Sequence, residues 1–112
     1  MRKGWHILEE AGGVTLCRHM PPRFDVAAHT HLPAARPARL AHQIRQDLWR
    51  ALRDVRGFSP VVRLERDGAG WTVTAGGRAM GQVSAEVEAR IEAVLNDVAK
   101  RDRWISNAGI MS

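Results

Sequence analysis

The sequence contains very little cysteine, tyrosine or lysine. It has a single cysteine, Cys17, no tyrosine, and only two lysines among 17 basic residues. One cysteine excludes an intramolecular disulfide framework, and no apolar run is long enough to span a bilayer. Residues 1–10 begin basic but lack the apolar segment of a signal peptide, so we expect a cytoplasmic protein that does not enter a membrane.

Catalytic and cofactor motifs are missing as well. The carboxylates are dispersed or lie at helical spacing from arginines, and no two of them stand out as an acid–base couple. The paired glycines, Gly12-Gly13 and Gly76-Gly77, are typical of turns rather than of a phosphate-binding loop between a strand and a helix. We therefore expect neither an enzyme nor a bound cofactor.

The histidines raise the question of a metal site. Cys17 and His19 would share one face of a strand, and His29 and His31 one face of another. These four side chains could converge on zinc or copper if the two strands paired suitably. Their spacing fits no established zinc finger or knuckle, so we predict no metal site.

The basic charge is the first feature that points to a function. The net charge is +5 and the isoelectric point about 10.9, which favours nucleic acid or another anionic partner. Residues 37–83 hold eight basic and four acidic residues, so the excess lies in the middle of the chain. Fifteen of the 17 basic residues are arginine. This bias reflects either a GC-rich genome or the use of the guanidinium group to grip phosphate in two places.

Local patterns predict β structure in two parts of the chain. Residues 5–10 and 14–19 suit a hairpin, and residues 24–32 a further extended segment. After a connector at 33–37, the pattern resumes with a strand at 60–66, in which Val62 and Leu64 face inward. Residues 67–70 form the strongest turn signal. The partner strand covers 71–75, Gly76-Gly77 forms another turn, and 78–83 is either a short third strand or a loop.

Two amphipathic helices complete the pattern. The first covers residues 37–56, with Pro37 at its first turn and Gly57 closing it. Its apolar stripe consists of Leu40, Ile44, Leu48, Ala51, Leu52 and Val55. The second begins after the N-cap Ser84, with Glu86 and Glu88 in its first turn. Its buried stripe consists of Val87, Ile91, Val94, Leu95 and Val98. Trp104 falls off this stripe, so it docks either onto the body or onto another protein.

These elements predict an α+β fold in a single domain, 1–112. We expect a small antiparallel sheet with two amphipathic helices packed on one face. Residues 1–36 form an N-terminal β region and connector, 37–105 an α-β-β-(β)-α core, and 106–112 a tail. The order over 37–105 resembles the double-stranded-RNA-binding fold in outline. That family has a lysine-rich stretch where its last helix starts, whereas residues 82–88 here are acidic, so any RNA contact falls to the first helix.

The polar face of the first helix is the candidate site. At about 100° per residue it gathers a basic set around one indole, while Asp47 and Asp54 lie together at one edge. The set consists of Arg39, His42, Gln46, Trp49, Arg50, Arg53 and Arg56, with Arg45 at its border. Arginine and glutamine can bind phosphates and Trp49 can stack on a base. The alternative is that Trp49 packs beneath the N-terminal β region and the arginines only reach around it to water.

Two functions follow from this face. The first is a small module that binds nucleic acid, RNA above all, with low sequence specificity. The second is an adaptor or accessory subunit that presents the same face, or Trp104 and the tail, to a protein partner or to a second copy of itself. Both require an exposed tryptophan, and they differ in what neutralises the arginines.

Overall fold

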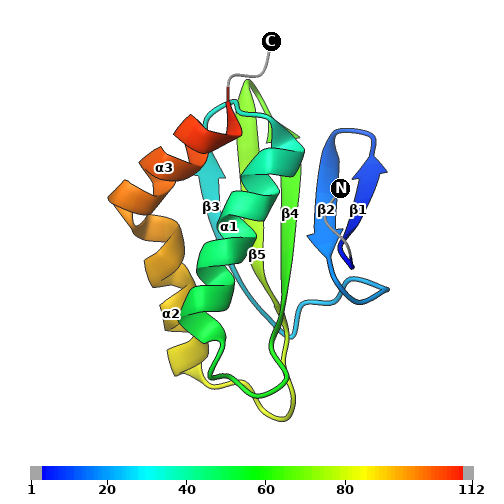
Figure 1. Cartoon of the computed structure of the whole chain (residues 1–112), viewed down its shortest axis with the longest axis vertical. Helices are drawn as coiled ribbons and strands as arrows, with labels where there is room; N and C mark the ends of the chain where they lie inside the picture. Colours follow the sequence, from blue (N-terminus) through cyan, green and yellow to red (C-terminus); the bar gives the residue numbers. More distant parts are fainter. Residues whose placement is uncertain (1–3, 110–112) are drawn as a thin grey trace.

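The computed structural model describes residues 4–109 and shows an α+β fold (Figure 1). Five antiparallel strands form one sheet in the order β1-β2-β4-β5-β3. The strands are β1 (His6–Glu10), β2 (Gly13–Cys17), β3 (Val26–Leu32), β4 (Ser59–Asp67) and β5 (Gly70–Arg78). Three helices, α1 (Pro37–Leu52), α2 (Ala85–Asn96) and α3 (Val98–Ala108), pack against the sheet. No helix of the described chain is both long and apolar enough to cross a membrane.

The β4–β5 hairpin forms the centre of the sheet. Its strands turn at Asp67–Gly70, where the turn was predicted, and Gly68 adopts a left-handed φ of +60°. Val62 and Leu64 are fully buried while Glu65 is exposed, as the alternating pattern predicts. The predicted turn at Gly76-Gly77 is wrong, because both glycines pair within β5. No third strand follows at 79–84, which is described as loop.

The N-terminal strands attach to both edges of this hairpin. The β1–β2 hairpin joins through β2 to β4, whereas β3 pairs with β5 on the opposite side. The connection at 18–25 therefore crosses from one side of the sheet to the other (Figure 1). Because β3 precedes α1 and occupies the place next to β5, the resemblance to the double-stranded-RNA-binding fold does not extend to the order of the strands.

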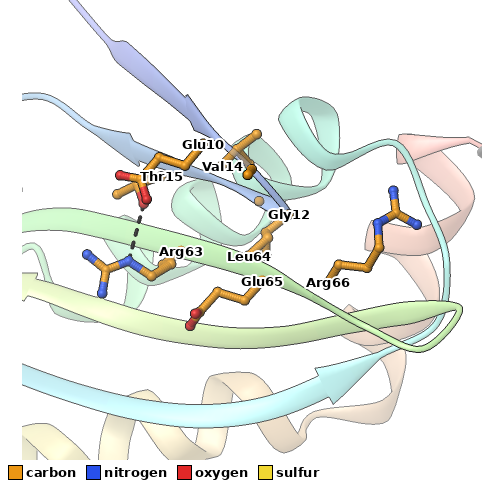
Figure 2. Close-up of a pocket in the computed structure, with 10 residues that line it drawn as sticks. Glu10, Gly12, Val14, Thr15, Arg63, Leu64, Glu65 and Arg66 are labelled. Atoms are coloured by element: carbon orange, nitrogen blue, oxygen red, sulfur yellow. Dashed lines mark hydrogen bonds between the residues drawn. The ribbon is translucent and has the colours of Figure 1, made fainter.

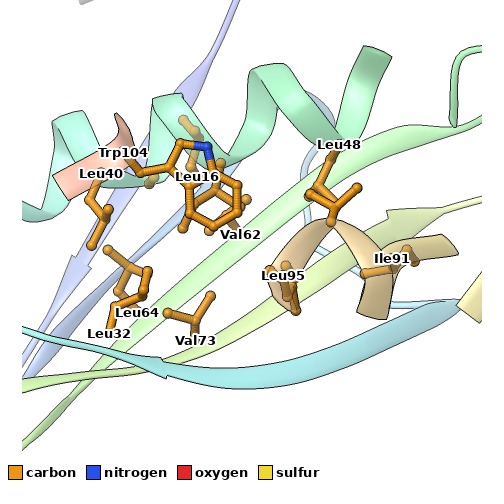
Figure 3. Packing of buried hydrophobic residues seen from close by; sticks show 14 of the residues in the cluster. Leu16, Leu32, Leu40, Leu48, Val62, Leu64, Val73, Ile91, Leu95 and Trp104 are labelled. Carbon is orange, nitrogen blue, oxygen red and sulfur yellow. The ribbon is translucent and has the colours of Figure 1, made fainter. Parts of the chain in front are cut away.

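One face of the sheet carries the core. Leu40, Ile44 and Leu48 of α1 are fully buried and pack with Val62 and other sheet residues (Figure 3). Ile91, Leu95 and Trp104 bring α2 and α3 into the same cluster. Fully buried side chains of this size each contribute about 1.5–3 kcal/mol, so this layer holds the helices on the sheet.

The helix boundaries differ from the sequence prediction in two places. Helix α1 ends at Leu52 instead of 56, and Gly57 lies in the loop before β4 with φ +70°. The predicted second helix is divided at Asp97, whose side chain accepts a hydrogen bond from the backbone N–H of Lys100 and so caps α3. This break turns Val98 out of the predicted buried stripe, and its side chain is 71% exposed.

Candidate nucleic-acid interface

The polar face of α1 is divided into three sectors by its neighbours. Towards α2 and α3, Asp47 is buried and binds Arg103 and the indole of Trp104. Arg50 also lies 3.3 Å from the Asp47 carboxylate, so it is partly held by this network. Asp54 pairs with Arg90 of α2 at 2.6 Å. The two acidic residues at the edge of α1 thus fasten the helix to its neighbours.

The opposite flank of α1 lies against residues next to the N-terminal hairpin. The ring of Trp5 meets His42 edge-on at a centroid distance of 6.3 Å. The guanidinium of Arg45 lies 4.8 Å from the Trp5 ring centroid, and that of Arg18 lies 5.9 Å away on the same ring. His42, a predicted contact residue, is therefore half-buried against an indole. In this position His42 packs against Trp5 and is less accessible to a bound nucleic acid than the exposed residues of the helix.

The remaining candidates lie on the outer surface. Arg39 of α1 is exposed, and so are Arg53 and Arg56, which were predicted on the helix but follow its end at Leu52; Gln46 is half-buried. Trp49 is 45% exposed. The alternative in which Trp49 packs beneath the N-terminal β region is not observed: Trp5 contacts His42 and Arg45, and Trp49 keeps 45% of its surface exposed.

A pocket of about 440 Å³ lies between the flank of α1 that carries Arg45 and Trp49 and the residues next to the N-terminal hairpin. Its lining includes Trp5, Arg18, His19, Arg45, Trp49 and Phe58. None of its nine described lining residues is acidic. The sequence pattern singled out Trp49 and noted Arg45 at the edge of the helix face. It could not associate Trp5, Arg18 and His19 with them, because those residues flank the N-terminal hairpin and lie far from α1 in the sequence.

A second pocket, of about 450 Å³, lies on the sheet face away from the helices (Figure 2). Arg63 donates from Nε to Thr15 Oγ1 at 3.3 Å, and its guanidinium lies 5.3 Å from the ring centroid of Phe24. Glu10 and Glu65 line the same hollow, one on each side of Gly13 in the strand register. This mixed charge does not favour a polyanion, so the two pockets differ in the ligands that they suit.

Of the two outcomes predicted for Trp104, docking onto the body is confirmed and presentation to another protein is wrong. Its side chain is completely buried, and its indole N–H donates to Asp47 at 2.7 Å. Trp104 therefore cannot present an indole to another protein in this fold. The end of the predicted tail, Ile110 to Ser112, lies outside the described residues.

The residues considered as metal ligands lie on separate strands: Cys17 ends β2, whereas His29 and His31 are on β3, with β4 and β5 between them. Cys17 is buried and donates to the thioether of Met20 at 3.7 Å; burial raises the pKa of its thiol, which Arg78 partly opposes. His29 bonds Thr74, and His31 lies near Thr72 and Asp67. Within residues 4–109, no group of three histidine, cysteine or acidic side chains is placed to hold a metal ion.

Comparison with known proteins adds no relative: no family model, curated protein or solved structure matches this chain. The candidate interface consists of an exposed indole on α1, exposed arginines on this helix and just after its end, and an adjoining aromatic pocket with no acidic residue among its described lining residues.

Proposed function

We propose that this protein binds nucleic acid, RNA above all, with low sequence specificity through the outer face of α1. The observation that carries the proposal is the exposure of Trp49, 45% of whose surface is accessible, on the same helix as the exposed Arg39 and close to the exposed Arg53, which caps the end of that helix. Arg56, in the loop that follows, extends the row. Guanidinium groups bind phosphate oxygens in two places, and an indole stacks on any base.

Low specificity follows from the kinds of contact available. Phosphate contacts position a nucleic acid without reading its sequence, and stacking on an indole tolerates every base. On the outer face of α1, the uncharged hydrogen-bonding groups for reading base edges are the half-buried side chain of Gln46 and the indole N–H of Trp49. The contacts to phosphate would therefore supply most of the affinity.

The test is fluorescence anisotropy of labelled single-stranded and duplex RNA and DNA, at low and physiological salt. We expect micromolar or tighter binding that weakens as salt rises, with a log–log slope of about −0.7 per phosphate contact on single strands and about −0.9 on duplex DNA. Absence of binding at low salt would overturn the proposal.

A matched pair of variants locates the surface. Replacing Arg39, Arg53 and Arg56 with glutamine lowers the net charge by three and should weaken binding and flatten its salt dependence. The control replaces the exposed Ala89, Ala93 and Ala99 with glutamate, which changes the net charge equally on α2 and α3. Arg50 is left intact because it contacts buried Asp47. Equal effects of the two triple variants would show that only net charge matters.

The same anisotropy measurement distinguishes nucleic-acid binding from the second candidate function, the binding of a protein partner. A protein partner anchored on Trp49 would bury apolar surface, so its affinity would depend much less on salt than that of a polyanion. If nucleic acid fails to bind while self-association is detected by sedimentation and lost in Trp49→Ala, the face serves a second copy of the chain instead.

A further inference from the structure

The pocket beside Trp49 is assembled from segments far apart in the sequence. Trp5 precedes β1, Arg18 and His19 follow β2, and Trp49 comes from α1. Phe58 and Pro60 complete it from the start of β4. It is therefore a product of the tertiary fold and reaches beyond the helix face on which the proposed function rests.

Its aromatic walls, Trp5, Trp49 and Phe58, differ in how much of their surface is exposed. Trp5 is half-buried and held by His42 and Arg45, which contact its ring at centroid distances of 6.3 and 4.8 Å. Phe58 is only 7% exposed and belongs to the buried core. Trp49 is the accessible wall, so a ligand that covers it removes apolar surface from water.

The charge of the pocket selects the kind of ligand. Arg18, Arg45 and His19 line it, and no acidic residue does so among its nine described lining residues. An aromatic pocket of this charge repels the quaternary or methylated ammonium groups that aromatic cages usually bind. It suits a planar aromatic ring that can stack on an indole and is attached to a negative group. Its volume of about 440 Å³ falls within the about 300–1,000 Å³ of small-ligand sites.

We infer that this pocket holds one unpaired nucleobase of a bound strand, with the adjoining phosphate near Arg18. The inference rests on the proposed function and names its substrate class, a single-stranded nucleic acid. A base within a duplex is stacked on both faces and paired along its edge, so it cannot enter without unpairing. The protein should accordingly prefer single strands, loops or ends over continuous duplex.

The test compares a short single-stranded RNA with the same oligonucleotide carrying abasic nucleotides, which keep the phosphates and lack the bases. Wild-type protein should bind the base-containing strand roughly 5- to 150-fold more tightly, the range measured for stacking of one base on an aromatic side chain. Trp49→Ala should reduce this ratio towards one. Val98→Ala, which removes an exposed apolar side chain on α3, is the matched control and should keep the ratio.

Mononucleotides provide a second readout. Trp71 and Trp104 are 3% and 0% exposed, so quenching of tryptophan fluorescence by adenosine monophosphate would come from Trp5 and Trp49. We expect saturable quenching that is lost in Trp49→Ala and weakened in Arg18→Gln. Trp5→Ala is a less direct test because Trp5 also covers His42.

The outcomes distinguish the inference from the proposed function. If the intact and abasic strands bind equally, with a steep salt dependence, the helix face binds phosphates and the base pocket is refuted. If no nucleic acid binds at all, both proposals fail. If an acidic aromatic peptide quenches Trp49 where mononucleotides do not, the pocket belongs to a protein partner and the inference is overturned.

Discussion

The indole N–H of Trp104 on α3 donates a hydrogen bond of 2.7 Å to the carboxylate of Asp47 on α1. Trp104 is completely buried and Asp47 is 4% exposed. Arg103 binds the same carboxylate oxygen, and Arg50 the other at 3.3 Å. The polar edge of an indole is thereby satisfied inside the core, which is the usual condition for burying a tryptophan. This contact fixes α3 against the candidate binding helix.

Removing the shared acceptor should therefore destabilise the fold. Asp47→Ala leaves the buried Trp104 N–H without its acceptor, while the exposed Arg103 guanidinium can turn to water, and we expect a loss of about 1–3 kcal/mol in the free energy of unfolding. Asp47→Asn keeps one acceptor oxygen and should lose less. Urea denaturation at neutral pH measures both. Asp54→Ala, an exposed control, should have a much smaller effect, and equal losses at both positions would contradict this assignment.

Arg101 links the end of α2 to the outer edge of β3. Its guanidinium donates to the Leu95 carbonyl at 2.8 Å, to Thr30 Oγ1 at 2.8 Å and to the His31 carbonyl at 2.6 Å. Arg101→Ala should lower the free energy of unfolding by about 1–3 kcal/mol because it leaves these acceptors without the guanidinium. Hydrogen exchange should also speed up at β3 amides. The neighbouring exposed residue supplies a control, Asp102→Ala, which should leave β3 exchange unchanged.

Gly57 is required for two separate reasons. Its φ of +70° is left-handed, and a Cβ there would collide with Cγ of Met80. Gly68 has φ +60° but open space around it, so Gly68→Ala should carry only the backbone cost, about 1–2 kcal/mol. Gly57→Ala should lose about 0.5–1.5 kcal/mol more, because the exposed Met80 side chain must leave its rotamer to make room. Combining it with Met80→Ala should recover that difference in thermal unfolding; no recovery would mean that Met80 is not the obstacle.

Stability should fall in acid through three aspartates with lowered pKa values. Hydrogen bonds from Arg23 to Asp25, from Arg90 to Asp54 and from the Lys100 backbone to Asp97 hold these pKa values below the ordinary 3.8. Because the folded state binds these protons more weakly, the stabilisation is complete above pH 3.8 and is lost as pH falls through the lowered values.

Asp97→Asn isolates one of these contributions. Asparagine can still cap α3 but does not titrate, so the free energy of unfolding should depend less on pH in the acid range. Denaturant unfolding at neutral pH and below pH 3.8 gives the comparison. A variant whose acid dependence equals that of the wild type would show that Asp97 does not contribute to it.

Much of the local structure was predictable because it depends on neighbours along the chain. Alternation placed Val62 and Leu64 in the core, and the glycines of residues 67–70 produced the central turn. The spacing of Leu40, Ile44 and Leu48 correctly indicated the buried side of α1. Gly76 and Gly77 misled the prediction, since glycine permits a turn but also fits a strand where backbones approach closely.

The sequence by itself determined the α+β class, the amphipathic helix and its basic, tryptophan-bearing face, because helical and strand periods are local properties of a chain. Only the tertiary structure decided which side chains of that face remain available. Trp5 came to lie beside His42 and Arg45, while Trp49 stayed 45% exposed. Trp104, off the apolar stripe, was buried because Asp47 on another helix accepts its N–H. Exposure depends on contacts between distant segments, and no local period encodes them.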